Sequence, residues 1–79
     1  MKNKITEILG WYGVVAIVAA YIMAIFSLIK PTDFWYLILN GTGAAGIVID
    51  ALNDKNYQPV VLNLIWAVIA GIAIIRLLI

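Results

Sequence analysis

The chain has 79 residues, of which 66% are hydrophobic and 11% charged, and its net charge is +1 at pH 7. Soluble domains carry charge on about a quarter of their residues, so this composition excludes an ordinary soluble protein. With no Cys and no His, the chain lacks disulfides and the commonest zinc ligands, and we expect neither a metal site nor a cofactor. The few Lys and Arg residues are scattered along the chain, which argues against nucleic-acid binding.

Three long apolar runs account for nearly the whole sequence. A bilayer core about 30 Å thick is crossed by roughly 20 helical residues, at about 1.5 Å per residue. We therefore expect membrane spans over about residues 8–29, 34–52 and 59–78. The sequence predicts an all-α integral membrane protein, with residues 1–79 forming a single domain, a bundle of three transmembrane helices.

Short polar segments separate the three runs. Pro31 disfavours helical geometry at the residue before it, and either Thr32 or Asp33 can cap the second helix. Residues 53–56 form a turn, and Pro59 suits the first turn of the third helix, where its missing N–H matters least. Because both connections are short, neighbouring spans are expected to run antiparallel.

The N-terminal run is longer than the apolar region of a signal peptide, which has about 7–15 residues, so we expect a retained first span. Lys2, Lys4 and Lys55 fall on one side of the predicted membrane, and Lys30 and Arg76 fall on the other. The positive-inside rule leaves the orientation open, because the two sides differ by one residue.

Small residues recur at helical spacing in all three runs. Small side chains let helix backbones approach closely inside a bilayer, so we expect these residues to pack the helices against one another or against a second copy. The predicted packing residues are Gly13, Ala16 and Ala20, extended by Ala24 and Ser27, in the first run, Gly41, Gly43, Ala45 and Gly46 in the second, and Ala67 and Gly71 in the third. The glycines of the second run also permit a flexible helix that rocks during alternating access.

Asn40, Asp50, Asn63 and Trp66 interrupt the apolar runs. Polar groups in a membrane are functional candidates because an unpaired one costs free energy. On a helical wheel, Asn40 and Asp50 share one sector of the second span, and Asn63 and Trp66 share one of the third. Antiparallel packing would let Asp50 meet Asn63, and we predict that all four side chains face a solute. The alternatives are interhelical hydrogen bonds for the two Asn, a solvated carboxylate for Asp50 and a packed indole for Trp66.

Three stretches of the chain carry a resemblance to a family of small, uncharacterised three-span bacterial membrane proteins. They are Gly10-Trp11-Tyr12-Gly13, Asn40-Gly41-Thr42-Gly43-Ala44 and Pro59-Val60-Val61-Leu62-Asn63-Leu64-Ile65-Trp66-Ala67. The resemblance implies location in the bacterial cytoplasmic membrane. More distantly, the layout is similar to the SemiSWEET and PQ-loop proteins, whose three-helix units pair as parallel dimers around a sugar pathway. That similarity implies a homodimer with Asn63 facing the solute, but the first span lacks the Pro-Gln pair and sugar specificity does not carry over.

The sequence thus favours a homodimeric, half-transporter-like unit with a central path or pocket for a small polar solute. No span has an acidic residue near its middle, which argues against a small multidrug-type proton-coupled carrier. Nucleophilic triads and phosphate loops are absent from the sequence, so we do not expect an enzyme. One alternative is an accessory or assembly subunit that docks onto another membrane protein through its small-residue faces. Another is a holin-like pore former, although the charged tail expected there is missing after Arg76.

Overall fold

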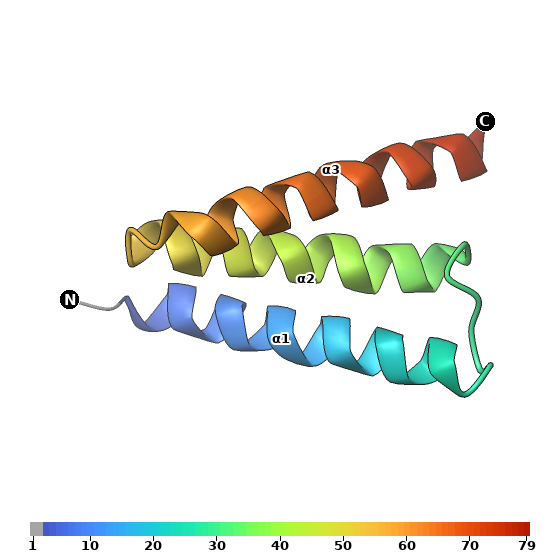
Figure 1. Ribbon diagram of the computed structural model, residues 1–79, viewed down its shortest axis with the longest axis horizontal. Coiled ribbons are helices and arrows are strands. Elements are labelled where there is room, and N and C mark those ends of the chain that lie inside the picture. Colours follow the sequence, from blue (N-terminus) through green and yellow to red (C-terminus); the bar gives the residue numbers. More distant parts are fainter. Residues whose placement is uncertain (1–2) are drawn as a thin grey trace.

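The computed structural model describes residues 3–79 and contains three helices that run alternately up and down (Figure 1). They are α1 (Lys4–Ile25), α2 (Phe34–Asn53) and α3 (Tyr57–Leu78). Each helix is long and apolar enough to cross a membrane, in agreement with the three predicted spans. Lys2, one of the charges counted for membrane orientation, lies outside the described residues.

The helix boundaries differ from the predicted spans mainly in α1. This helix begins at Lys4 rather than near residue 8, because the side chain of Asn3 caps it by accepting a hydrogen bond of 2.8 Å from the Ile5 N–H. It ends at Ile25, four residues before the predicted limit. The other two helices begin and end within two residues of the predicted limits.

The early end of α1 is a Schellman motif, a helix end whose left-handed residue is usually Gly. Ser27 occupies the left-handed position with φ 61°. Its N–H donates to the Ala24 carbonyl at 3.1 Å, and the Leu28 N–H donates to the Met23 carbonyl at 2.8 Å. The apolar run hides this end because no Gly marks it. Ser27 is therefore exposed and outside the helix, and the prediction that it extends the packing face of the first span is wrong.

The end of α2 repeats this arrangement with Lys55 at the left-handed position, φ 56°. The Lys55 N–H donates to the Leu52 carbonyl, and the Asn56 N–H donates to the Ala51 carbonyl. At the start of α2, Asp33 is the N-cap residue but makes no side-chain bond to the helix. Its carboxylate accepts the Lys30 backbone N–H instead, at 3.0 Å, and so braces the α1–α2 connection.

We expect Ser27→Gly and Lys55→Gly each to raise the free energy of unfolding by about 0.5–1 kcal/mol. An L-residue in the left-handed region costs roughly 1–2 kcal/mol, and the greater chain entropy of unfolded glycine offsets part of the gain. Reversible unfolding in mixed micelles measures the change. Ser27→Ala is the control, because alanine keeps the strain, and an equal gain in that variant would contradict the explanation.

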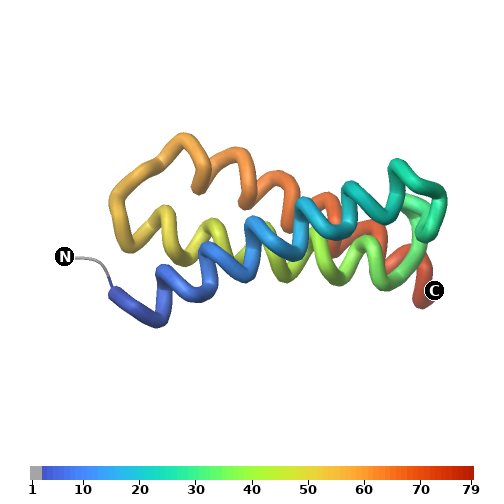
Figure 2. Tube along the Cα trace, turned by 90° about the horizontal axis from the view of Figure 1, so that it is seen from below, coloured from blue at the N-terminus to red at the C-terminus, as the bar shows by residue number. Residues whose placement is uncertain are grey.

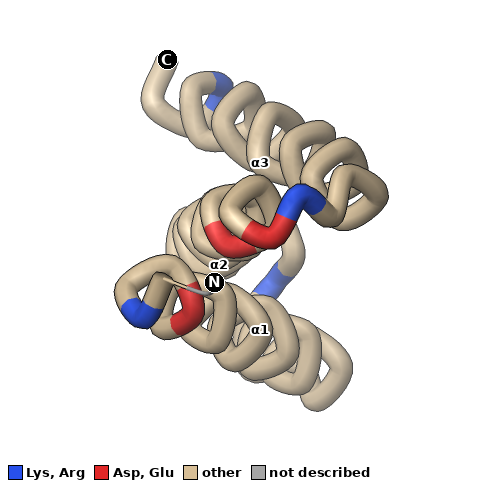
Figure 3. Tube along the Cα trace, turned by 90° about the vertical axis from the view of Figure 1, so that its left-hand side faces the viewer, with Lys and Arg blue, Asp and Glu red and all other residues tan. Residues whose placement is uncertain are grey.

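α2 is the central helix of the molecule. Seen end-on, it lies between α1 and α3 (Figure 3), and within the described residues α1 and α3 make no close backbone approach to each other. The outer helices are inclined in opposite directions relative to α2 (Figure 2). In Figure 2 their traces cross near mid-length and are separated at both ends, with α2 between them (Figure 3). A single copy therefore encloses no channel between its three helices.

The α1–α2 interface brings the two backbones into direct contact. On α1, the buried positions are Gly10, Gly13, Ala16 and Ala20. A Cβ atom built on Gly13 would overlap the Gly43 carbonyl oxygen of α2. One built on Gly46 would lie 2.5 Å from the Leu9 carbonyl oxygen, closer than real Cβ contacts. Both positions of close approach therefore require glycine.

The α2–α3 interface is looser, and only Ala70 is buried on α3. A Cβ atom on Gly41 would lie 3.2 Å from the Ala70 Cβ atom, so Gly41 faces α3. Ala67 is half-buried and Ala45 is exposed. A Cβ atom on Gly71 would meet no atom within 4 Å. The predicted packing residues Ala45 and Gly71 thus lie outside the tight contacts between helices.

Candidate functional site

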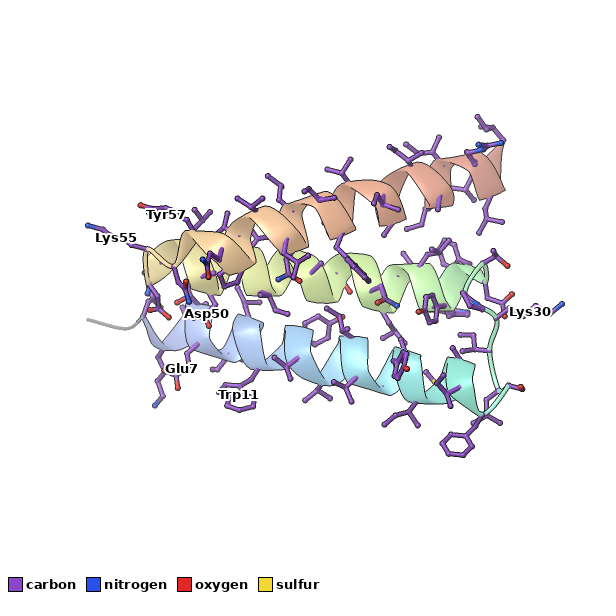
Figure 4. The ribbon with its side chains drawn as sticks, viewed as in Figure 1. Glu7, Trp11, Lys30, Asp50, Lys55 and Tyr57 are labelled. Carbon is purple, nitrogen blue, oxygen red and sulfur yellow. The ribbon has the colours of Figure 1, made fainter. Side chains whose placement is uncertain are left out.

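A pocket of about 270 Å³ lies at the end of the molecule that holds the start of α1 and the α2–α3 connection (Figure 4). All three helices and the α2–α3 connection contribute to its wall. The lining residues are Gly10, Trp11, Val14, Ile47, Asp50, Ala51, Asp54, Asn56 and Pro59. Figure 4 shows Asp50 beside α1 at this end, near the α2–α3 connection that carries Lys55.

Asp50 is the residue of this pocket whose environment is least favourable. It lies in the last turn of α2, where a negative charge is disfavoured by the helix dipole. Its side chain packs against Gly10 of α1, so closely that a Cβ atom on Gly10 would lie 2.9 Å from the Asp50 Cβ atom. The Oδ1 atom is buried without a hydrogen-bond partner. Such an atom costs free energy and calls for a functional or structural explanation.

The remaining polar groups of the pocket lie around its mouth. Asp54 and Asn56 are both exposed, and Asp54 also takes part in an interaction with another group. Among residues 3–79, the lining includes two carboxylates and no Lys or Arg, so the charged side chains of the described lining are all acidic. Another part of the wall is apolar, formed by residues such as Val14 and Ile47. This combination suits a small ligand with one polar end and one apolar end.

Asn40 and Trp66 lie together in a different place. They border a groove of about 210 Å³ between α2 and α3, with Tyr36 and Ala70 also in its wall. Asn40 is 5% exposed, and its Nδ2 atom donates to the Tyr36 carbonyl at 2.9 Å. Trp66 is 50% exposed. The Asn40 amide therefore directs a donor to its own helix.

Asn63 lines neither the Asp50 pocket nor the Asn40–Trp66 groove. It is half-buried, and its Nδ2 atom donates to the Pro59 carbonyl one turn earlier, at 2.9 Å. Within the described residues, Asp50 and Asn63 form no hydrogen bond. The contact expected between them is not seen, because Asp50 packs towards α1 and Asn63 bonds to its own helix. The four predicted solute-facing residues are thus divided among separate places.

A hydrogen bond that sequence reasoning missed joins α1 to α2. The Tyr12 hydroxyl lies 2.7 Å from the Thr42 Oγ1 atom. Thr42 donates its proton to the Ile38 carbonyl at 2.6 Å, so Tyr12 is the donor to Thr42. An aromatic residue near the start of a span suggests an anchor at the membrane surface, and nothing in the spacing pairs it with Thr42.

We expect Tyr12→Phe to lower the free energy of unfolding in micelles by about 1 kcal/mol, as is typical of interhelical hydrogen bonds in membranes. The phenyl ring keeps the packing and removes only the donor. Tyr21→Phe, at a tyrosine that is 60% exposed, is the matched control and should leave the stability unchanged. Equal effects of the two substitutions would show that the Tyr12–Thr42 bond contributes nothing.

Comparison with known protein families gives a match over nearly the whole chain. A protein-family model matches residues 6–79. The chain belongs to that family. The match includes all of α2 and α3 and most of α1, so every residue that lines the Asp50 pocket falls within it. No curated protein and no solved structure matches the chain, and nothing in the comparisons supports the similarity to the SemiSWEET and PQ-loop proteins.

Proposed function

We propose that this protein is a self-associating subunit of a bacterial cytoplasmic membrane that binds a small polar solute in the Asp50 pocket and acts as half of a transporter. The observation that carries the proposal is the buried, unpartnered Oδ1 atom of Asp50 in a pocket to which all three helices contribute. An ionisable side chain within a membrane span is costly and usually marks a binding site or pathway. The proposal moves the solute site from the Asn40, Asn63 and Trp66 set to Asp50.

Self-association follows from the layout of the helices. Because α2 separates α1 from α3, one copy can wall only one side of a pathway. A second copy would supply the opposite wall, as in a parallel or antiparallel pair of three-helix units. The outer helices leave most of their large apolar side chains exposed, so both lipid and a second copy can cover them.

The α1–α2 interface suits a unit that changes conformation during transport. Gly13 meets Gly43, and Gly46 meets the Leu9 backbone, so much of the contact is between smooth backbone surfaces. Small sliding movements of packed helices are one of the common ways in which proteins open and close sites. Since Gly10 contacts Asp50 in the same interface, a shift of α1 would alter the exposure of the carboxylate.

Uptake into proteoliposomes tests the proposal, with Asp50→Asn as the variant and Asp33→Asn as the matched control. Both change one carboxylate to an amide in α2 or its cap, but Asp33 is exposed at the opposite end and does not line the pocket. We expect saturable uptake of at least one small polar solute by the wild type and by Asp33→Asn, and none by Asp50→Asn. Absence of both uptake and ligand-induced thermal stabilisation across a broad solute panel would contradict the proposal.

The accessory-subunit function is favoured by a separate observation. Ala45 is exposed and Gly71 has open space beside it, so two small-residue sites remain for a helix of another protein. If this function holds, one membrane protein should co-purify with the wild type in stable stoichiometry, and Ala45→Leu or Gly71→Leu should release it. Purification as a homo-oligomer alone would count against an accessory role.

A further inference from the structure

We infer that the solute of the Asp50 pocket is a small organic ammonium ion. This inference rests on the proposed function and adds the chemical class of the ligand. Its basis is that two features meet in one pocket of about 270 Å³. One is the Asp50 carboxylate, which has a buried oxygen without a hydrogen-bond partner, and the other is an apolar wall formed by residues of α1 and α2.

The charge of the pocket selects the polar end of the ligand. Asp50 lines the pocket, and its Oδ1 atom is buried and accepts no hydrogen bond within the described residues. An ammonium group beside this carboxylate supplies the opposite charge and N–H donors. Asp54 is a second carboxylate of the lining, which includes no Lys or Arg among the described residues. Anionic ligands would meet only repulsion from these two groups.

The apolar lining and the volume of the pocket determine the non-polar part of the ligand. Val14, Ile47 and Ala51 offer hydrocarbon surface, which a bare cation would leave uncovered. Within residues 3–79, no group of three or more acidic side chains could hold a metal ion. A sugar would need polar partners around its whole ring, whereas the polar side chains of the lining are the two carboxylates, Asn56 and the indole of Trp11. The volume lies just below the usual range for ligand pockets, about 300–1,000 Å³, so the carbon skeleton must be small.

Gly10 of α1 makes room for the Asp50 side chain at this side of the pocket. Gly10 leaves the space that the Asp50 side chain fills, and a Cβ atom there would overlap the carboxylate. Trp11 and Val14, the neighbouring positions on α1, border the same pocket. The ligand would therefore contact α1 and α2 together and stabilise their association.

The experiment uses the purified protein in nanodiscs at neutral pH, with 3-methylbutylammonium chloride as the probe. The neutral control is 3-methylbutan-1-ol, which has the same carbon skeleton, and sodium chloride at equal ionic strength controls for salt. We expect saturable binding of the ammonium ion by calorimetry, at least tenfold tighter than binding of the alcohol, and no heat of binding for sodium. Asp50→Asn should weaken ammonium binding at least tenfold, and Asp33→Asn should leave it unchanged.

Asp54→Asn is a second, independent variant, at an exposed residue of the pocket lining. Removing this charge should weaken ammonium binding about two- to fivefold without changing alcohol binding. Equal affinities for the ammonium ion and the alcohol, or ammonium binding unaffected by both substitutions, would overturn the inference and leave the proposed solute pocket standing. Binding of neither probe, together with no uptake of any solute by the same preparation, would overturn both.

Discussion

Gly13→Ala is expected to lower the free energy of unfolding in detergent micelles by about 1–3 kcal/mol, the usual range for forcing extra atoms into a packed interface. The added methyl group would overlap the Gly43 carbonyl oxygen and would also lie 2.7 Å from the Ile47 Cγ1 atom. A backbone carbonyl cannot turn aside as a side chain can. The two helices must therefore separate, and the contacts along the α1–α2 interface weaken together.

Gly71→Ala is the matched control for this prediction. Both substitutions add one methyl group to a glycine within an apolar helix, but a Cβ atom at Gly71 meets no atom within 4 Å. Alanine also favours the helix over glycine by about 1 kcal/mol, so we expect Gly71→Ala to be neutral or slightly stabilising. If Gly13→Ala proves as stable as Gly71→Ala, the close α1–α2 backbone contact does not exist in the folded protein.

Asp50→Asn is expected to raise the free energy of unfolding by about 1–2 kcal/mol while it removes solute binding. The amide has nearly the shape of the carboxylate, and burying a neutral polar atom costs less than burying a charged one. A gain in stability with a loss of function is the usual result where a site keeps an unfavourable group for its activity. Thermal unfolding in nanodiscs without added solute measures the first effect.

Asp33→Asn separates this effect from a general change of charge. Because Asp33 is exposed, its substitution should change the stability by less than about 0.5 kcal/mol. If Asp50→Asn instead destabilises the protein by more than about 1 kcal/mol, the Asp50 carboxylate has a stabilising partner in the folded protein and serves the fold.

The three helices were predictable because charges and prolines delimit the apolar runs. The end of α1 was not, since Ser27 occupies the left-handed position that glycine usually marks. The helical spacing of Gly13, Ala16 and Ala20 predicts that they share one side of α1, and all three are buried in the structure. Which small residues make contact depends on how each helix is rotated about its axis. That rotation leaves Ala45 exposed, although it shares the small-residue block of α2.

The candidate site was predictable in part. The cost of a charge inside an apolar run singled out Asp50, but antiparallel packing alone could not say which neighbouring helix it faces. Gly10 decides this, because its missing side chain leaves room on α1. The solute contacts predicted for the two Asn side chains stay a prediction, and in the structure each amide donates to the carbonyl four residues earlier in its own helix. Sequence spacing does not exclude that local bond.

The tryptophans offer a direct test of where solute binds, because Trp11 borders the Asp50 pocket and Trp66 borders the Asn40 groove. Two single-tryptophan variants, with the other tryptophans changed to Phe, can be titrated with 3-methylbutylammonium in nanodiscs. We predict a saturable change in the fluorescence of the Trp11-only variant, lost on adding Asp50→Asn, and no change in the Trp66-only variant. A saturable response from Trp66 with none from Trp11 would place the site in the Asn40 groove and contradict the assignment to Asp50.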